Sequence, residues 1–300
     1  MQKNDNNRQY LLIADSGSTK TTWCIASEDN ERIILNTGGI NPVVQDDMAI
    51  QTLLTEELLP QLKSSGLLSG QVDGVYFYGA GCLPSVCERM KKHLRKIIPE
   101  VTAPEVESDL LGAARALCGH SAGIACILGT GSNSCFYNGK EIMQHISPLG
   151  YILGDEGSGA TLGKHFISNL LKGLLTQELC EAFAEDYGLT ERDIIRKVYR
   201  ETNANRFLAS LTMFIHKHRQ HPDIHDLVTA SFRDFFHRNV DAYKRHDLPV
   251  HFTGSIAYYF HKELNEAARD CNYQIGKITP HPIHEITNFH LQIAEKSALT

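Results

Sequence analysis

The stretch LLIADSGSTKTTWCIAS, residues 11–27, ends an apolar run on a carboxylate and then bends through small residues. Residues 9–15 and 21–27 have the composition of β-strands, and a turn at 16–20 separates them. Because so short a connection joins antiparallel neighbours, we predict a hairpin that carries Asp15 beside its turn. The hairpin raises the question of what a carboxylate does next to a bend of such small groups.

The same order of elements recurs later in the chain. A third strand is predicted at 31–36, after the hairpin. Residues 123–146, GIACILGTGSNSCFYNGKEIMQHI, again read as a buried strand, a small-residue turn and two further strands. The Asn138-Gly139 pair is typical of a tight hairpin turn. The repeat predicts an α/β protein of two domains built on one plan.

A domain boundary is expected near Gly119, where glycine breaks an Ala/Leu-rich helix that begins at Asp109. The first domain is predicted over 1–118 and the second over 119–282. A final helix over 283–300, opened by a proline, would join the first domain.

The remaining elements are predicted from periodicity and turn residues. Helices are expected at 45–64, after Pro84, and at 161–173, 177–187, 189–200 and 226–244, with strands at 72–82, 101–107 and 274–279 and a strand–turn–helix at 249–260. The histidine-rich run HKHRQH, 216–221, has no helical pair of ligands with a third nearby, so it is interpreted as a solvated helix face.

Composition excludes several classes of function. The chain has 300 residues, 42% of them apolar and 21% charged, and a net charge of −6. That charge argues against non-specific nucleic-acid binding, and no run of about 18 apolar residues suggests a membrane span. The polar N-terminus lacks a signal-peptide core, and the eight cysteines form no CxxC pair. We expect a reduced, cytoplasmic protein without a disulfide framework.

The two turns have residues suited to phosphate. Backbone N–H groups and hydroxyls of small-residue turns can donate to phosphate oxygens, although a plain hairpin turn is the simpler reading of either one. The candidate groups are Gly17, Ser18, Thr19 and Lys20 in the first turn and Gly129, Thr130, Gly131 and Ser132 in the second. Neither turn is a Walker A loop. Lys20 could balance phosphate charge or simply be solvated, and Asp15 beside phosphates implies a water-mediated Mg²⁺.

Five motifs in order carry a family resemblance. They are DSGSTKT (15–21), SDLLGAARA (108–116), LGTGSNS (128–134), LGDEGSG (153–159) and FTGSIA (252–257). Over nearly the whole chain the set resembles the N-acetylglucosamine kinase group, often labelled with the BadF/BadG/BcrA/BcrD ATPases, of the actin-like ATPase superfamily. The resemblance implies two ribonuclease-H-like domains around a nucleotide-binding cleft, with ATP phosphates on the two turns and adenosine against Gly254 and Ser255.

The resemblance also implies a sugar site and a catalytic base. Asp109 would accept the proton of the sugar 6-hydroxyl; its alternative role is that of an ordinary helix N-cap. The other substrate-binding residues that the resemblance implies are Asn41, Gly79, Gly81, Gly150, Asp155 and Glu156. Asp155 could likewise be only a helix cap. Some relatives carry a tryptophan where this chain has Leu149-Gly150-Tyr151, so the sugar stays open.

The implied function is an ATP- and Mg²⁺-dependent kinase of an amino sugar, with N-acetylglucosamine first and glucosamine or N-acetylmuramate as variants. A second reading is an activating ATPase for a 2-hydroxyacyl-CoA dehydratase, which would need cysteines for an iron–sulfur cluster at a dimer interface. Candidates for those ligands are Cys118, Cys126 and Cys135. A third reading is a non-catalytic sugar sensor. A small-molecule sugar is the expected partner, without nucleic acid or membrane, and a homodimer is compatible with the resemblance.

Overall fold

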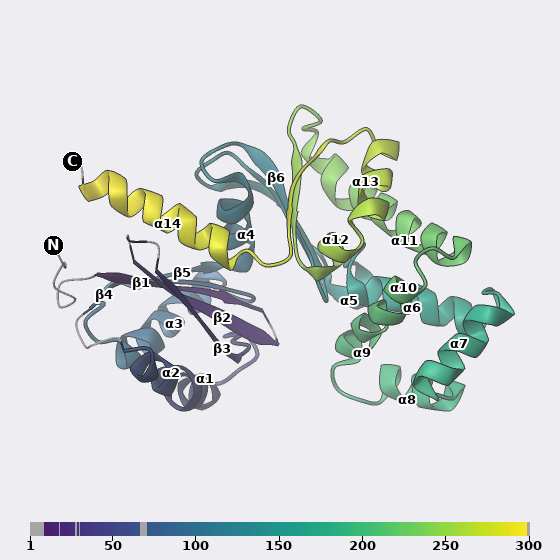
Figure 1. The fold of residues 1–300 in the computed structure, drawn as a ribbon, viewed down its shortest axis with the longest axis horizontal. Helices are drawn as coiled ribbons and strands as arrows, with labels where there is room; N and C mark the ends of the chain where they lie inside the picture. The colour runs from purple at the N-terminus through teal and green to yellow at the C-terminus, as the bar shows by residue number, and fades with distance from the viewer. Residues whose placement is uncertain (1–8, 18, 28, 30, 67–70, 299–300) are drawn as a thin grey trace. The chain divides into compact units, whose positions relative to one another are not determined.

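The chain forms two compact units. The structure, a computed structural model, describes residues 9–17, 19–27, 29, 31–66 and 71–298. The first unit combines Met1–Gly119 with Pro282–Thr300, and the second is His120–His281. Gly119, where we expected a boundary, has φ 59° and follows the last residue of a helix. Each unit is an α/β body with its own sheet (Figure 1).

The first unit is built on a five-stranded mixed sheet. Its strands are β1 (Tyr10–Ser16), β2 (Lys20–Ser27), β3 (Arg32–Gly38), β4 (Val72–Gly79) and β5 (Glu105–Ser108). Their order in the sheet is β3-β2-β1-β4-β5. β1, β2 and β3 are antiparallel neighbours, which confirms the predicted hairpin, whereas β1, β4 and β5 are parallel.

Helices cover both faces of this sheet. They are α1 (Asp47–Leu53), a π-helical segment (Leu54–Leu58), α2 (Leu59–Ser64), α3 (Pro84–Ile97), α4 (Asp109–Cys118) and α14 (Ile283–Ala298). Because successive strand residues face opposite sides, Leu12 and Ala14 join the core beneath α1–α3. Leu11 and Ile13 join the core beneath α4 and α14. Figure 1 shows α1, α2 and α3 on one side of the sheet and α4 and α14 on the other.

The C-terminal helix α14 is held on the first unit by a buried polar network. The Tyr78 hydroxyl on β4 lies 2.7 Å from Nε2 of His290. Arg115 of α4 donates to the same hydroxyl and to Glu105. Burial lowers the pKa of His290 to about 3, so its ring is neutral at physiological pH.

The second unit repeats the plan of the first sheet. Its strands are β6 (Gly123–Leu128), β7 (Ser132–Tyr137), β8 (Ile142–Ile146), β9 (Val250–Thr253) and β10 (Ile275–Thr279). They lie in the order β10-β9-β6-β7-β8, with β6, β7 and β8 antiparallel and β6, β9 and β10 parallel. The predicted repeat of a three-strand opening is therefore confirmed.

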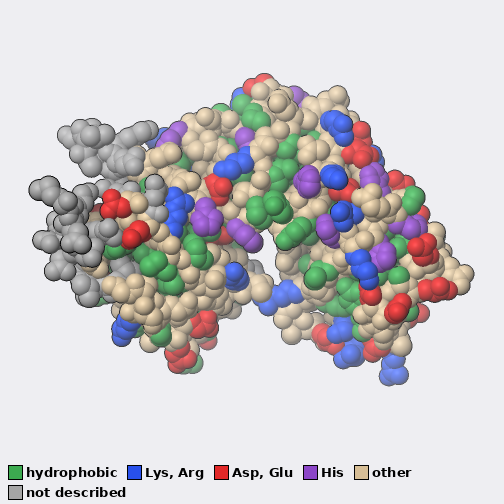
Figure 2. Space-filling model, viewed as in Figure 1, with side chains coloured by type: hydrophobic (Ala, Val, Ile, Leu, Met, Phe, Trp, Pro, Cys, Tyr) green, Lys and Arg blue, Asp and Glu red, His purple; other side chains and the backbone are tan. Residues whose placement is uncertain are grey.

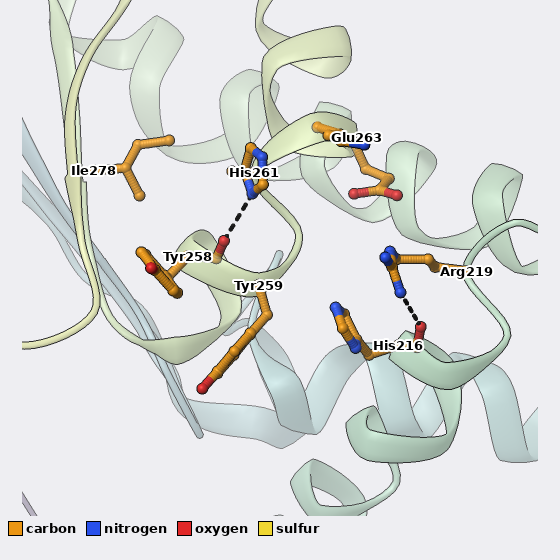
Figure 3. Close-up of a pocket in the computed structure, with 8 residues that line it drawn as sticks. His216, Arg219, Tyr258, Tyr259, His261, Glu263 and Ile278 are labelled. Carbon is orange, nitrogen blue, oxygen red and sulfur yellow. Dashed lines mark hydrogen bonds between the residues drawn. The ribbon is translucent and has the colours of Figure 1, made fainter.

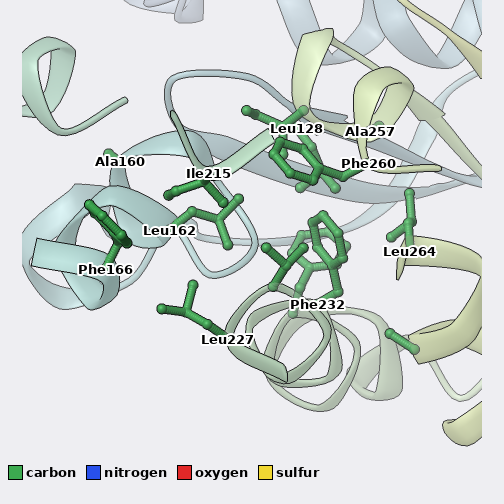
Figure 4. Packing of buried hydrophobic residues seen from close by; sticks show 14 of the residues in the cluster. Leu128, Ala160, Leu162, Phe166, Ile215, Leu227, Phe232, Ala257, Phe260 and Leu264 are labelled. Atoms are coloured by element: carbon green, nitrogen blue, oxygen red, sulfur yellow. The ribbon is translucent and has the colours of Figure 1, made fainter. Parts of the chain in front are cut away.

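Most helices of the second unit surround one apolar core. They are α5 (Gly150–Leu153), α6 (Gly159–Leu171), α7 (Gln177–Tyr187), α8 (Glu191–Tyr199), α9 (Ala204–Ser210), α10 (Thr212–Lys217), α11 (Pro222–Phe235), a π segment (Phe236–Val240), a 3₁₀ turn (Asp241–Tyr243), α12 (Ser255–Tyr259) and α13 (His261–Asp270). Figure 4 shows Leu128 of the sheet beside Phe232 and Phe260 in this core. The prediction of a helix face at 216–221 holds only for His216 and Lys217, because α10 ends at Lys217 and residues 218–220 form a turn.

The surface carries charges of both signs. Figure 2 shows Lys and Arg side chains interspersed with Asp and Glu on the face in view. Among the described residues, no helix is both long and apolar enough to cross a bilayer.

Candidate functional site

The carboxyl ends of three parallel strands gather the predicted residues of the first unit. Ser16 on β1 pairs with Gly79 on β4, and Gly79 pairs with Ser108 on β5. Asp15 and Asp109 therefore lie at the same edge of the sheet. Ligands of open α/β sheets bind outside this edge, so the structure places both predicted carboxylates where a ligand is expected.

Burial perturbs the pKa of both carboxylates, and Asp109 adds to the change at Asp15. Burial and the nearby Asp109 carboxylate raise the pKa of Asp15 to about 7. Burial also raises the pKa of Asp109 to about 6, although the backbone N–H of Leu110 opposes the change. Neither carboxylate forms an ion pair with a basic side chain of the described chain. A nearby cation would relieve this unfavourable arrangement.

Asp109 does not cap the helix that it begins. Ser108 is the N-cap of α4, and its Oγ accepts a hydrogen bond from the Leu111 N–H at 3.2 Å. The Asp109 carboxylate accepts the adjacent Leu110 N–H at 2.9 Å. The capping alternative is therefore wrong, and the helix leaves the Asp109 carboxylate available for other chemistry.

The carboxylate pair fits a magnesium ion. Proteins bind Mg²⁺ through one or two carboxylates completed by water and substrate phosphates. Asp15 and Asp109 offer oxygen donors of that kind, and their mutual repulsion would fall on binding a dication. The described residues contain no cluster of three or more His, Cys, Asp or Glu that could hold a metal alone. Phosphate and water would have to complete the coordination.

A backbone hydrogen bond closes the first small-residue turn, and the space beside Gly17 is not filled by packed side chains of the described residues. The Gly17 N–H donates to the Lys20 carbonyl at 3.0 Å. A Cβ added to Gly17 would contact only that carbonyl, at 3.7 Å, so packing inside the protein does not require glycine here. Thr19 and Lys20 are exposed, and Ser18 lies outside the described residues. A ligand that approaches the backbone would explain the small residue.

Ser16 ties this turn to the following loop, a role that the sequence prediction missed. Its fully buried hydroxyl lies 2.6 Å from the Thr21 hydroxyl and accepts the Ile40 N–H at 3.1 Å. The Gly39 N–H donates to the Thr19 carbonyl. These hydrogen bonds are a structural reason for serine at position 16.

The structure also brings Asn41 against the predicted glycine loop. A Cβ on Gly81, which has φ +75°, would lie 2.2 Å from Oδ1 of Asn41. That oxygen accepts the Val43 N–H at 3.0 Å. A Cβ on Gly79 would lie 2.9 Å from Sγ of Cys82. Close packing thus explains both glycines, while sugar contact by these residues stays a prediction.

In the second unit, the first turn of α6 holds the second small-residue turn. The Gly129 N–H donates to the Gly131 carbonyl at 2.9 Å. The Gly159 and Ala160 N–H groups donate to the Gly129 and Thr130 carbonyls, at 2.8 and 3.1 Å. A Cβ on Gly129 would meet nothing within 4 Å. This turn, like the first, is internally braced and leaves its glycine open.

Asp155 braces the same turn instead of capping a helix. Ser158 is the N-cap of α6 and accepts the Thr161 N–H. The buried Asp155 carboxylate accepts the Ser132 N–H at 3.2 Å, and burial is the main cause that raises its pKa. The backbone of Asp155 adopts the left-handed conformation, with a φ of 55°. The capping alternative is wrong, and the sugar-binding role stays a prediction.

Glu156 contacts side chains of the π segment, and Gly150 lies at the start of a short helix. The Glu156 carboxylate accepts the side-chain amide of Asn239 at 3.3 Å and lies 3.8 Å from Arg238. Gly150 is exposed, with φ +73°, at the start of α5. Their predicted contacts with sugar also stay predictions.

The third small-residue turn lies directly against the second. The Gly254 N–H donates to the Thr279 carbonyl at 3.0 Å. A Cβ on Gly254 would lie 2.3 Å from the Leu128 carbonyl oxygen, and its φ of +113° is rare for other residues. Glycine is therefore required, and Ser255 is exposed beside it.

Two buried hydroxyls at these turns lack a hydrogen-bond partner among the described residues. They are Oγ of Ser132, in the second turn, and Oγ1 of Thr253, before the third. Buried polar atoms normally have partners. Both atoms lie at turns for which the sequence predicts nucleotide contact.

A cavity of about 370 Å³ opens one helical turn beyond Gly254, and the sequence analysis did not predict it. Its walls come from α10, the segment after it, α12, α13 and β10. The lining residues are His216, Arg219, Tyr258, Tyr259, His261, Lys262, Glu263 and Ile278 (Figure 3). The run YYFHKE after the Gly-Ser turn is the signal that could have indicated part of it.

The proposed iron–sulfur ligands are poorly placed. Cys126 and Cys135 are fully buried in β6 and β7, and only Cys118 is partly exposed. A cluster shared at a dimer interface needs thiolates at the surface, so these positions do not favour the dehydratase-activator reading.

Similar solved structures share the whole fold. The chain is 48% identical to a protein from Porphyromonas gingivalis provisionally identified as an N-acetylglucosamine kinase, with a TM-score of 0.90, 94% of this chain and 99% of that one covered. A Chromobacterium violaceum protein with the same provisional identification is 17% identical, with a TM-score of 0.72 and coverage of 94% and 98%. MamK bound to AMPPNP is 11% identical, with a TM-score of 0.52 and coverage of 96% and 99%.

The chain matches no protein-family model and no curated protein. The 48% identity extends over nearly the full length of both chains, and the more distant likenesses show the same two-domain fold. The chain therefore belongs to the N-acetylglucosamine kinase family and has the actin-like ATPase and sugar kinase fold.

Proposed function

We propose that this sugar kinase transfers the γ-phosphoryl group of ATP to the 6-hydroxyl of N-acetylglucosamine. The observation that carries the proposal is the pair of carboxylates at the carboxyl edge of the first sheet, Asp15 and Asp109, with no basic partner among the described residues. The 48% identity to the Porphyromonas gingivalis protein supports the choice of sugar.

Asp109 is the proposed general base. Its carboxylate is close enough to its ionisation point at neutral pH to accept a proton, because burial raises its pKa to about 6. It would take the proton of the sugar hydroxyl as that oxygen attacks the γ-phosphorus. Phosphoryl transfer needs mainly positioning and charge neutralisation, so a single well-placed carboxylate is sufficient on the protein side.

The turns are the proposed phosphate-binding elements. The open glycines Gly17 and Gly129 allow phosphate oxygens to approach backbone N–H groups. Lys20 is an exposed cation at the first turn. The Ser132 hydroxyl, which lacks a partner among the described residues, is a donor that bound phosphate could use after a small local adjustment. Gly254 and Ser255 would lie along the nucleoside.

Asp15 is the proposed residue that holds Mg²⁺, through water. When bound, the ion would neutralise charge on the phosphates. Asp15 itself would then be ionised, because a nearby cation lowers the pKa of a carboxylate.

The proposed sugar contacts of the first unit are Asn41 and the loop from Gly79 to Gly81, and those of the second unit are Asp155 and Glu156. The hydroxyl groups of a hexosamine pair well with carboxylates, which accept two hydrogen bonds. Asn41 already packs on Gly81, so a shared pocket wall is supported by their contact.

The test is ADP release from Mg·ATP with a panel of sugars: N-acetylglucosamine, glucosamine, N-acetylmannosamine, N-acetylmuramate, glucose and no sugar. We expect strong stimulation by N-acetylglucosamine and its loss in Asp109→Asn. Asp73→Asn is the matched control, because Asp73 is exposed at the opposite end of β4. Stimulation by another sugar alone would replace the substrate, and sugar-independent hydrolysis would refute a kinase.

A further inference from the structure

Ser16, the last residue of β1, is bonded to both segments of the first unit that are proposed to contact the sugar. Its carbonyl accepts the Ala80 N–H, in the glycine loop, at 2.8 Å. Its hydroxyl accepts the Ile40 N–H, directly before Asn41, at 3.1 Å. The preceding residue is Asp15, the carboxylate proposed to hold magnesium. One residue therefore links the metal side of the candidate site to both sugar segments.

The hydroxyl of Thr21 extends this link across the base of the phosphate turn. Thr21 pairs with Ser16 across the hairpin, and the two fully buried hydroxyl oxygens lie 2.6 Å apart. The Thr21 hydroxyl also lies 3.0 Å from the Gly38 carbonyl, and the Ser16 hydroxyl lies 3.0 Å from the Ile40 carbonyl. Each hydroxyl has a single proton to donate. A proton in the short contact between the two hydroxyls leaves the other for one of the carbonyls, so in either arrangement the pair holds the segment from Gly38 to Ile40.

This segment presents the Asn41 side chain with its donor end free. Oδ1 of Asn41 accepts the Val43 N–H at 3.0 Å, which fixes the orientation of the amide because only the oxygen can accept. Gln45 holds the same segment, since its side chain accepts the Asn41 N–H at 2.7 Å and donates to the Gly39 carbonyl at 3.1 Å. No residue in the described part of the chain accepts a hydrogen bond from Nδ2 of Asn41. That nitrogen is therefore available to donate to a sugar oxygen.

We propose that Ser16 and Thr21 are positioning residues for phosphoryl transfer, because their hydroxyl pair fixes the Asn41 segment relative to Asp15 and the phosphate turn. The inference rests on the proposed kinase function and adds two fully buried residues that act through their neighbours. Transfer requires the sugar hydroxyl and the γ-phosphorus to be held close together in line. A misplacement of about 1 Å can lower the rate about 100-fold.

Loss of the Ser16 hydroxyl should disturb the sugar side of the site and spare the phosphate turn. The Ile40 N–H is part of a fully buried residue and would lose its acceptor. An unpaired buried N–H is costly, so the segment would shift to pair it. The turn keeps its own hydrogen bond from the Gly17 N–H to the Lys20 carbonyl. Sugar kinetics should therefore change while nucleotide binding does not.

The test compares Ser16→Ala and Thr21→Val with two matched controls, Ser27→Ala and Thr21→Ser. Ser27 is a buried serine on the same hairpin, and its hydroxyl has no hydrogen-bond partner among the described residues. Thr21→Val keeps the shape of the side chain without the hydroxyl, and Thr21→Ser keeps the hydroxyl. For each variant, kcat and KM for N-acetylglucosamine are measured at saturating Mg·ATP, the Kd for AMPPNP by equilibrium dialysis, and the melting temperature by calorimetry.

We expect Ser16→Ala and Thr21→Val to lose at least about tenfold of kcat/KM for the sugar, with an unchanged Kd for AMPPNP. Both controls should keep wild-type kinetics. If Ser16→Ala does not fold, the comparison of Thr21→Val with Thr21→Ser decides the matter.

Four results would overturn the positioning role. They are wild-type sugar kinetics in the folded variants that lack a hydroxyl, an equal loss in Thr21→Ser, a parallel loss of AMPPNP binding, and failure of both Ser16→Ala and Thr21→Val to fold, which would assign the pair to stability alone. Each of these results leaves the kinase proposal standing. A wild type that phosphorylates no sugar would overturn both proposals.

Discussion

Replacing Asp15 by asparagine should stabilise the protein at alkaline pH while it abolishes the proposed activity. Asp15 is a desolvated carboxylate beside Asp109, so its charge opposes folding when no cation is bound. Its pKa in the folded protein, about 7, lies above the ordinary aspartate value of 3.8. The folded state thus holds the proton more tightly, and the protein loses stability as the pH rises from about 4 to 7.

The size of this loss follows from the pKa shift. One unit is worth about 1.4 kcal/mol, so the rise from 3.8 to about 7 sets an upper limit of about 4 kcal/mol. Solvent screening of the partly exposed side chain reduces this to about 1–2 kcal/mol. In a protein of this size we expect the melting temperature to change by a few degrees.

The assay is differential scanning calorimetry with EDTA at pH 5 and pH 8. Asp15→Asn should melt above the wild type at pH 8, with a smaller gap at pH 5, and Asp73→Asn should follow the wild type at both. Adding Mg·ATP should stabilise the wild type more than Asp15→Asn. A gap that is the same at both pH values, or a variant that melts below the wild type at pH 8, would refute the account of Asp15 as a strained charge.

Three further predictions concern the first unit. Because Asp109 must be ionised to accept a proton, kcat/KM should fall as the pH drops below about 6. The Asp109→Asn variant should lose about 100-fold or more of kcat. A pH–rate profile that stays flat down to pH 5 would contradict the role of Asp109. Gly81→Ala places a methyl 2.2 Å from Oδ1 of Asn41 and should raise KM for the sugar, while the Kd for ATP, measured by dialysis, stays constant. Tyr78→Phe removes the bonds to His290 and Arg115 and should lower the free energy of unfolding in urea by about 1–3 kcal/mol; an unchanged urea midpoint would show that the network adds no stability.

Local sequence patterns were sufficient to predict the strands and two carboxylates of the candidate site. Alternating apolar residues and small-residue turns located both hairpins, and each sheet pairs as its turns predicted. Asp15 lies near the end of β1 and Asp109 directly follows β5, and these strands share an edge because both run parallel to β4 between them. Residues at strand ends are therefore the part of the site that local patterns reveal well.

Contacts between distant segments could not be read in this way. Ser16 bonds to Ile40, and Asp155 accepts from Ser132, because the fold brings these segments together. The cavity around Glu263 joins three segments spread over about sixty residues of sequence, from His216 to Ile278, so no local motif defines it.

The interruptions within helices also could not be predicted from the sequence. The predicted helix at 45–64 contains a π-helical segment before Pro60. The short helices α9 and α10 carry few periodic positions, and the histidine run leaves α10 after Lys217 and forms a turn where a helix face was expected. Periodicity detects long amphipathic helices and becomes weak for segments of six or seven residues.

The return of α14 to the first unit has a consequence for the order in which the chain folds during synthesis. The second unit has all its strands within His120–His281, and domains generally fold as units as they emerge from the ribosome. The first unit begins earlier but receives the helix that contains Ile286 and His290 last. One face of its sheet therefore waits for α14, which follows the second unit in the sequence, and the unit that is translated second should complete its fold first.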